Sequence, residues 1–173
     1  MTQYNNKELA SFVKNFKMPT YNEIPSVGLY LEQVSKYITE CLAPISDTGL
    51  TGSMISNYVK KKLVSNPVKK QYSREQIAYL LFIAVAKSAL SMDEIKLVLE
   101  MQQMRCDAET AYNYFSNQLE NMLGYVFGLQ EAPKAIDNAD NEKTLLQSVL
   151  LVFCQKAYLE KALNAIKHPD ITE

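Results

Sequence analysis

Residues 50–80 read LTGSMISNYVKKKLVSNPVKKQYSREQIAYL, and the order of signals in this stretch decides the fold that we predict. A helix over 53–63 would place apolar side chains on one arc, namely Met54, Ile55, Tyr58, Val59 and Leu63. Its opposite arc would carry Ser53, Ser56, Asn57, Lys60 and Lys61. Thr51 or Ser53 can cap this helix. Lys62 falls on the apolar side near the end of the helix, where its stem can reach out to water.

A proline and a helix-capping motif follow this basic, amphipathic helix. Pro67 cannot continue a helix, and Ser73 with Gln76 three residues later forms a capping box that opens the next one. Residues 66–72, NPVKKQY, have room only for a tight hairpin or a loop between the two helices. The stretch therefore predicts a helix, a basic connection and a second helix in close succession.

Charge is distributed unevenly, although the whole chain has a formal net charge of −1. Residues 48–74 contain no acidic side chain and six basic ones, namely Lys60, Lys61, Lys62, Lys69, Lys70 and Arg74. Residues 91–173 contain 7 basic and 13 acidic side chains, a net charge of −6. A run of lysines is by itself typical of a solvated surface. Here it coincides with a helix and a hairpin, and a local positive face orients a protein on a polyanion.

Helical signals continue on both sides of the stretch. Upstream, apolar residues recur at helical spacing in two segments, Leu9–Phe16 and Leu31–Leu42. Downstream, a second capping box at Ser91–Glu94 opens a helix, Asp107 can cap another, and a last helix runs from about Glu142 to Lys167. Because the chain shows no β-alternating runs of any length, we predict an all-α protein with at most a very short β-hairpin.

We predict three parts: an N-terminal helix and linker (1–24), a helix-turn-helix head (25–104) and a C-terminal helical hairpin (105–173). The middle of the last helix, SVLLVFCQKAYL (148–159), is apolar nearly all round and needs cover. We expect a second subunit to cover it in a homodimer; the rival is the N-terminal helix folding back through Leu9, Phe12, Val13 and Phe16. The polar segment 131–142, which ends in DNADNE, is expected to be a solvated linker.

Groups able to perform catalysis are sparse. The one histidine, His168, lies near the end of the chain, and no P-loop, GxGxxG, HExxH or GxSxG motif is present. Cys41, Cys106 and Cys154 are scattered without a CxxC pair, which favours three buried thiols in a reducing cytoplasm. No segment has the pattern of a signal peptide or the apolar length of a membrane span. We therefore expect a cytoplasmic protein that is not an enzyme, with no metal, no cofactor and no membrane.

The motifs resemble two known groups of proteins. From about Leu50 to Met101, the chain resembles the DNA-binding head of MerR-type regulators, with a recognition helix, a basic wing ending in tyrosine and a helix joint at LSMDEI (90–95). From about Tyr30 onward it is more similar to bacterial proteins of domain-of-unknown-function family 1836. The motifs that carry this likeness are LYLEQVSKYI (29–38), LTGSMISNYVKKKLV (50–64), NPVKKQYSREQIAYL (66–80) and LSMDEI.

The MerR resemblance implies a regulator of transcription that binds double-stranded DNA, with helix 53–63 in the major groove and wing 66–72 on the phosphate backbone. The candidate DNA contacts are Ser53, Ser56, Asn57, Lys60, Lys61, Lys69, Lys70, Tyr72 and Arg74. MerR heads usually carry Arg-Tyr where this chain has Asn57-Tyr58, and the long coiled coil of those proteins is missing, so metal or drug sensing is not implied. The alternative is a helical protein-interaction module whose basic face docks an acidic partner.

Overall fold

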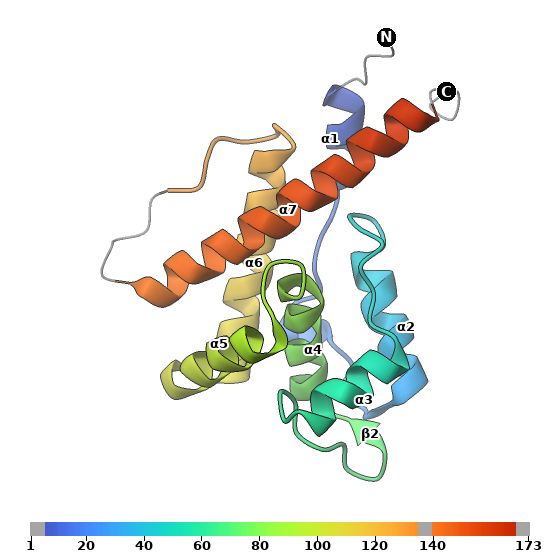
Figure 1. The fold of residues 1–173 in the computed structure, drawn as a ribbon, viewed down its shortest axis with the longest axis vertical. Coiled ribbons are helices and arrows are strands. Elements are labelled where there is room, and N and C mark those ends of the chain that lie inside the picture. Colours follow the sequence, from blue (N-terminus) through green and yellow to red (C-terminus); the bar gives the residue numbers. More distant parts are fainter. Residues whose placement is uncertain (1–5, 135–139, 169–173) are drawn as a thin grey trace.

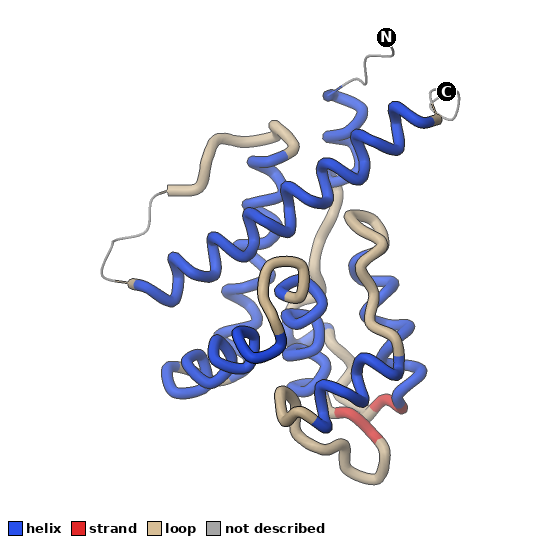
Figure 2. Tube along the Cα trace, viewed as in Figure 1, coloured by secondary structure: helices blue, strands red, loops and turns tan. Residues whose placement is uncertain are grey.

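The computed structural model of the chain describes residues 6–134 and 140–168. Within them the protein is mostly helical, as predicted, with one very small antiparallel sheet (Figures 1 and 2). The elements in chain order are α1 (Asn6–Lys14), the 3₁₀ helix η1 (Tyr21–Glu23), β1 (Leu29–Tyr30), α2 (Leu31–Leu42), α3 (Gly52–Lys60), β2 (Gln71–Tyr72), α4 (Arg74–Ala86), α5 (Met92–Arg105), α6 (Ala108–Val126) and α7 (Asn141–Lys167). The predicted all-α fold is therefore confirmed.

Helix α4 lies at the centre of the molecule. It packs against α2 on one side and against α6 and α7 on the other. Nine of its thirteen residues are buried, which explains why its sequence, REQIAYLLFIAVA, is apolar on all sides rather than along one stripe. Helix α3 and the segment leading to β2 lie at one end of the long axis, and α1 and the C-terminal end of α7 lie at the other (Figure 1).

Local capping signals are reproduced in detail. The Ser73 backbone N–H donates to Gln76 Oε1 at 2.8 Å, and the Gln76 N–H donates to Ser73 Oγ at 3.3 Å. The capping box at Ser91 and Glu94 and the cap at Asp107 also form. These three predictions are confirmed because each depends on residues only three positions apart.

The linker after α1 is held along α6 by hydrogen bonds. The Met18 N–H donates to Glu120 Oε1 at 2.9 Å, and the Tyr112 hydroxyl donates to the Pro19 carbonyl at 2.9 Å. The Tyr21 N–H donates to Asn113 Oδ1 at 2.9 Å. The linker then reaches the sheet, where Leu29 pairs with Tyr72 and Tyr30 with Gln71. Residues 18–30 therefore connect α6 to the small sheet.

Helix α7 is covered on one side and bare on the other. Val149, Leu150, Phe153 and Cys154 are buried, and α6, α4 and α1 pack against the helix. The alternative to a dimer required the N-terminal helix to fold back and cover α7. The N-terminal segment does fold back, and Leu9, Val13 and Phe16 are buried. Phe12 of that stripe is instead exposed, with Lys161 Nζ 4.8 Å from its ring centroid.

The segment 131–142 differs from the expected solvated linker. Residues 135–139, including Asp137 and Asn138, lie outside the described residues. Asp140 and Glu142 begin α7 and bind Arg105 at the end of α5, with N–O distances of 2.7 and 3.0 Å. An ion pair between residues 35 positions apart has no local sequence signal, so the sequence could not predict it.

Two further findings concern the burial of the cysteines and the possibility of a membrane-spanning helix. Of the three thiols expected to be buried, only Cys154 is; Cys41 and Cys106 are half-buried, and all three are free. Over residues 6–134 and 140–168, no helix is both long enough and apolar enough to cross a bilayer.

Candidate nucleic-acid interface

Helix α3 presents its polar arc to solvent. Thr51 is the N-cap, and its hydroxyl accepts a hydrogen bond from the Met54 N–H at 3.2 Å. Ile55 and Tyr58 are buried against the head and fix the rotation of the helix about its axis. The predicted contact residues of this helix are consequently exposed, namely Ser53, Ser56, Asn57, Lys60 and Lys61.

The helix ends earlier than predicted, at Lys60 instead of Leu63. The Leu63 N–H donates to the Tyr58 carbonyl at 3.0 Å, and the Lys62 N–H donates to the Val59 carbonyl at 2.9 Å. This is the Schellman arrangement, in which a residue with positive φ ends the helix and the next residue packs back on it. Lys62 has φ of 61° and Leu63 is buried beside Tyr58. The prediction that Lys62 lies on the apolar face of the helix is therefore wrong, and its side chain is exposed.

The predicted tight hairpin forms at residues 68–71. Val68 and Gln71 exchange two backbone hydrogen bonds, of 3.1 and 2.9 Å, around Lys69 and Lys70. Both lysines have positive φ, 51° and 64°, as in a two-residue type I′ turn. Their side chains are exposed, and the turn before β2 lies at the same end of the molecule as α3 (Figure 1). We call residues 66–72 the wing.

Close packing fixes the wing against the rest of the head. A Cβ at Gly28 would lie only 2.8 Å from Gln71 Cβ, so the chain beside β1 must be glycine for β2 to approach. At the start of the wing, Gln76 Nε2 donates to the Ser65 carbonyl at 2.8 Å and to Ser65 Oγ at 3.1 Å. The tip lysines therefore project from a connection that is held at both of its ends.

The basic segment has an unexpected backbone feature, which is positive φ at residues other than glycine. Among the described residues other than glycine, the ones with positive φ are Lys62, Lys69 and Lys70. Glycine or asparagine is the usual residue at the end of a Schellman motif and in a type I′ turn, because a Cβ is unfavourable there. All three positions carry lysine instead. A lysine at a backbone position that disfavours its Cβ raises the hypothesis that its side chain has a use other than folding.

The charges of the lysines are not neutralised within the molecule. None of the ion pairs found in the described residues involves Lys60, Lys61, Lys62, Lys69 or Lys70. One carboxylate lies nearby at the other end of α3, where a Cβ on Gly52 would lie 3.2 Å from Glu32 Oε1. The unpaired basic side chains of α3 therefore lie at its C-terminal turn, next to Asn57.

Two of the nine predicted contact residues are not presented with the lysines. Tyr72 is 4% exposed, and burial raises the pKa of its hydroxyl. Arg74 Nε donates to the Ile24 carbonyl at 2.8 Å, its two terminal nitrogens donate to Asn22 at 3.2 Å, and its guanidinium lies 5.7 Å from the Tyr21 ring centroid. In this structure both side chains hold the head together. The sequence could not separate them from the lysines, because their partners lie 43 to 53 positions upstream.

Lys62 is the residue that sequence reasoning left out of the interface. It lies immediately after Lys60 and Lys61 and points to solvent. The signal for it was the buried pair Leu63–Val64 directly after three lysines, a pattern expected when a helix ends and the chain folds back. No group of three or more histidine, cysteine, aspartate or glutamate side chains able to hold a metal ion occurs in the part of the chain that the structure describes.

Comparison with known proteins gives one match. No curated protein and no solved structure matches the chain. The family described as "Domain of unknown function (DUF1836)" matches residues 19–115, from the linker before η1 to the middle of α6. The match contains the whole head, including α3 and the wing, and covers more than half of the chain. The protein therefore belongs to the DUF1836 family.

Proposed function

We propose that this protein is a DNA-binding regulator of transcription, in which α3 enters the major groove and the wing contacts the phosphate backbone. The observation that carries the proposal is the set of lysines with positive φ. Lys62, Lys69 and Lys70 occupy backbone positions that glycine or asparagine would fill with less strain. Lysine is a compact positive charge suited to a phosphate, and these three are exposed.

The order of elements also supports a winged helix-turn-helix reading. Helix α2 is followed by α3, the wing pairs with β1 through the two-stranded sheet, and α4 begins directly after β2. An α-helix with its side chains is about 10–12 Å across, which fits the roughly 12 Å width of a major groove, and the nine residues of α3 extend about 13 Å along its axis. Asn57 lies on the exposed arc, and an asparagine amide can pair with the edge of adenine.

The use of lysine rather than arginine on this surface determines how we expect it to recognise DNA. Arginine binds guanine through two hydrogen bonds, whereas lysine is a point charge and discriminates less sharply between bases. We infer that most of the affinity comes from phosphate contacts by the wing and the C-terminal turn of α3, and that Asn57 supplies the base contact.

We also propose that α7 pairs two copies of the chain. Leu145, Val152, Leu159 and Ile166 are exposed and recur every seven residues along one side of α7. A seven-residue spacing supplies one of the two apolar positions per heptad that form the seam of a left-handed helix pair. Each half-exposed side chain contributes roughly 1 kcal/mol when it is covered, so the four of each copy contribute about 8 kcal/mol in total against an association penalty of about 4–15 kcal/mol. A dimer of micromolar affinity requires a net free energy of about −8 kcal/mol, so we expect further contacts around this stripe to contribute to the interface.

The test is a salt titration of the full chain with random duplex DNA. Each neutralised phosphate contributes about −0.9 to the slope of log K against log salt, so several contacts predict a slope steeper than about −3. Polyglutamate of similar length is the control, because an interaction module for acidic proteins would bind both polyanions alike. Absence of binding to duplex DNA at low salt would remove the DNA proposal.

A further inference from the structure

The exposed apolar side chains of the head belong to the small sheet or to the residues next to it. Along residues 13–96, the large apolar side chains that are exposed are Val27, Tyr30 and Val68. Val27 and Val68 are each 74% exposed, and Tyr30 is 53% exposed. Scattered apolar residues are ordinary on a protein surface. The concentration of all three at one small element points instead to a contact surface.

Strand pairing places two of them in one row with Gln71. Tyr30 is the partner of Gln71 across β1 and β2, and Val68 is the partner of Gln71 across the turn. Residues directly opposite each other in an antiparallel pair share one face of the sheet. The other pair, Leu29 and Tyr72, occupies the opposite face and packs on the core. We call the row of Val68, Gln71 and Tyr30 the outer face of the wing sheet.

The amide in the middle of this row is available to a partner. A Cβ at Gly28 would lie 2.8 Å from Gln71 Cβ and 3.2 Å from Gln71 Oε1, so the side chain of Gln71 lies across the glycine. Its amide forms no hydrogen bond with any residue that the structure describes. Two N–H donors and one acceptor oxygen are therefore free to bind.

One end of the row is cationic. Lys69 and Lys70 form the turn between Val68 and Gln71, and none of the ion pairs found in the described residues involves either lysine. The outer face thus combines apolar side chains, an unbonded amide and two uncompensated positive charges. The minor groove of DNA complements all three features, because it has phosphates along its edges, deoxyribose walls and hydrogen-bond acceptors on its floor.

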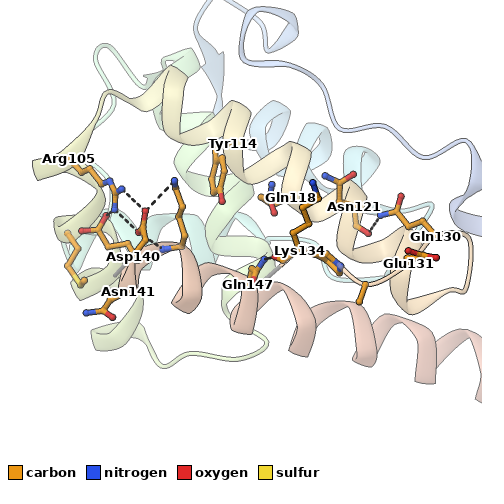
Figure 3. Close-up of a pocket in the computed structure, with 15 residues that line it drawn as sticks. Arg105, Tyr114, Gln118, Asn121, Gln130, Glu131, Lys134, Asp140, Asn141 and Gln147 are labelled. Carbon is orange, nitrogen blue, oxygen red and sulfur yellow. Dashed lines mark hydrogen bonds and ion pairs between the residues drawn. The ribbon is translucent and has the colours of Figure 1, made fainter. Parts of the chain in front are cut away.

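The charges around an open hollow between α5, α6 and the start of α7 balance one another instead. This hollow has a volume of about 1030 Å³, and its lining contains three basic and three acidic residues. Figure 3 shows Arg105 and Asp140 joined at one end of it, by hydrogen bonds of 2.8 and 2.7 Å. Lys143 Nζ lies 3.2 Å from Asp140 Oδ2. A polyanion is therefore attracted to the wing sheet rather than to this hollow.

We propose that the outer face of the wing sheet lies in the minor groove next to the major groove that α3 enters, an inference that rests on the proposed function. Val68 and Tyr30 contact deoxyribose, and Lys69 and Lys70 contact the phosphates beside them. Gln71 donates to N3 of adenine or O2 of thymine, where the 2-amino group of guanine would obstruct it. Gln71 thereby adds a preference for A·T pairs beside the site that Asn57 reads.

Two duplexes that differ only in the minor groove test this inference on the full chain. Inosine–cytosine and guanine–cytosine pairs have the same major-groove edges, but inosine lacks the 2-amino group. Fluorescence anisotropy with labelled alternating duplexes of each kind gives the two dissociation constants at one salt concentration. We expect the inosine duplex to bind about tenfold more tightly, because Gln71 reaches the groove floor only there.

Variants of the outer face separate its two kinds of contact. Gln71→Met keeps the length of the side chain and removes the amide, so the two duplexes should bind within about twofold of each other. The double change Val68→Ser and Tyr30→Ser should weaken both duplexes about tenfold. It should leave the slope of log K against log salt unchanged, because neither side chain neutralises a phosphate.

Leu97→Ser is the matched control, since Leu97 is 57% exposed but lies on α5. It should change neither the affinity nor the ratio between the duplexes. Circular dichroism establishes that each variant is folded.

The outcomes distinguish this inference from the proposed function. No binding to either duplex at low salt refutes the proposed function itself. Binding with equal affinity for the two duplexes overturns only the placement of the outer face in the minor groove. The same holds for an inosine preference that persists in folded Gln71→Met, and for unchanged affinity in the folded Val68→Ser, Tyr30→Ser variant. The ratio measured on the wild-type chain requires no variant to fold.

Discussion

The tip of the wing can be changed so that stability and DNA binding move in opposite directions. Lys69 and Lys70 have φ of 51° and 64°, and a left-handed backbone disfavours a residue with a Cβ by roughly 1–2 kcal/mol. The double change Lys69→Asn and Lys70→Gly installs the pair that favours this turn. Glycine also gives the unfolded chain more conformational freedom, which lowers the stability of the fold by roughly 0.5–1 kcal/mol. The expected net stabilisation is about 1 kcal/mol.

Both effects are measurable on the same preparation. For a chain of this size, 1 kcal/mol raises the thermal midpoint by about 2–4 °C, which circular dichroism detects. Loss of two phosphate contacts should flatten the slope of log K against log salt by about two units and weaken all duplexes alike. Fluorescence anisotropy with labelled duplex DNA at several salt concentrations gives that slope.

The double change Lys69→Ala and Lys70→Ala is the matched control. It removes the same two charges but keeps a Cβ at both positions, so DNA binding should fall equally and the thermal midpoint should not rise. Stabilisation by Asn-Gly with unchanged DNA affinity would refute the contact between wing and phosphate. Equal midpoints for the Asn-Gly and Ala-Ala variants would refute the inference that the lysines are held against their backbone preference.

Three other predictions concern base reading, assembly and pH. Asn57→Ala should weaken binding to a specific site by about 1–3 kcal/mol more than binding to random DNA; in a titration of both duplexes, equal losses would make Asn57 a backbone contact at most. Sedimentation at micromolar concentration should show a species of twice 19.6 kDa, and Leu159→Glu, which places a charge in the exposed stripe of α7, should reduce it to the monomer; a wild-type monomer under these conditions contradicts the α7 dimer. Arg105 and Lys143 lower the pKa of Asp140, so this carboxylate stabilises the fold above its unfolded pKa of about 3.9, and the stabilisation is lost as pH falls through the lower folded value. The difference in urea midpoint between wild type and Asp140→Asn, which keeps a helix cap, should be largest near neutral pH and shrink below about pH 4; a difference that is independent of pH would show that the ion pair contributes nothing.

Local signals explain what could be predicted from the sequence. The capping boxes at Ser73 and Ser91 and the apolar stripe of α3 depend on residues within one or two turns, and the structure reproduces them. The end of α3 was misplaced because Leu63 fits the helical stripe equally well when the chain folds back at Lys62. A periodicity cannot tell these two ways of burying Leu63 apart.

Long-range partners explain the rest. Tyr72 looked like the end of a basic wing, but its strand pairs with β1, some forty residues earlier. Arg105 gave no local signal of its carboxylate partners on α7. A cavity of about 440 Å³ between α4, α5, α6 and α7 requires four helices to be placed together, and no single segment of the sequence indicates it.

If the protein binds DNA as proposed, the linker of residues 18–30 has a consequence for the operator. One of its ends is bonded to Glu120 and Tyr112 on α6, Arg74 clasps its middle, and its other end is a strand of the wing sheet. The linker thus joins the wing sheet to α6, so the wing tilts relative to α6 only if these hydrogen bonds break. If two copies join through α7, the separation of their recognition helices becomes a fixed length of the protein. Such a dimer would keep most of its affinity for DNA when bases change at many positions of the site. It would lose affinity when a single base pair is inserted between the two half-sites.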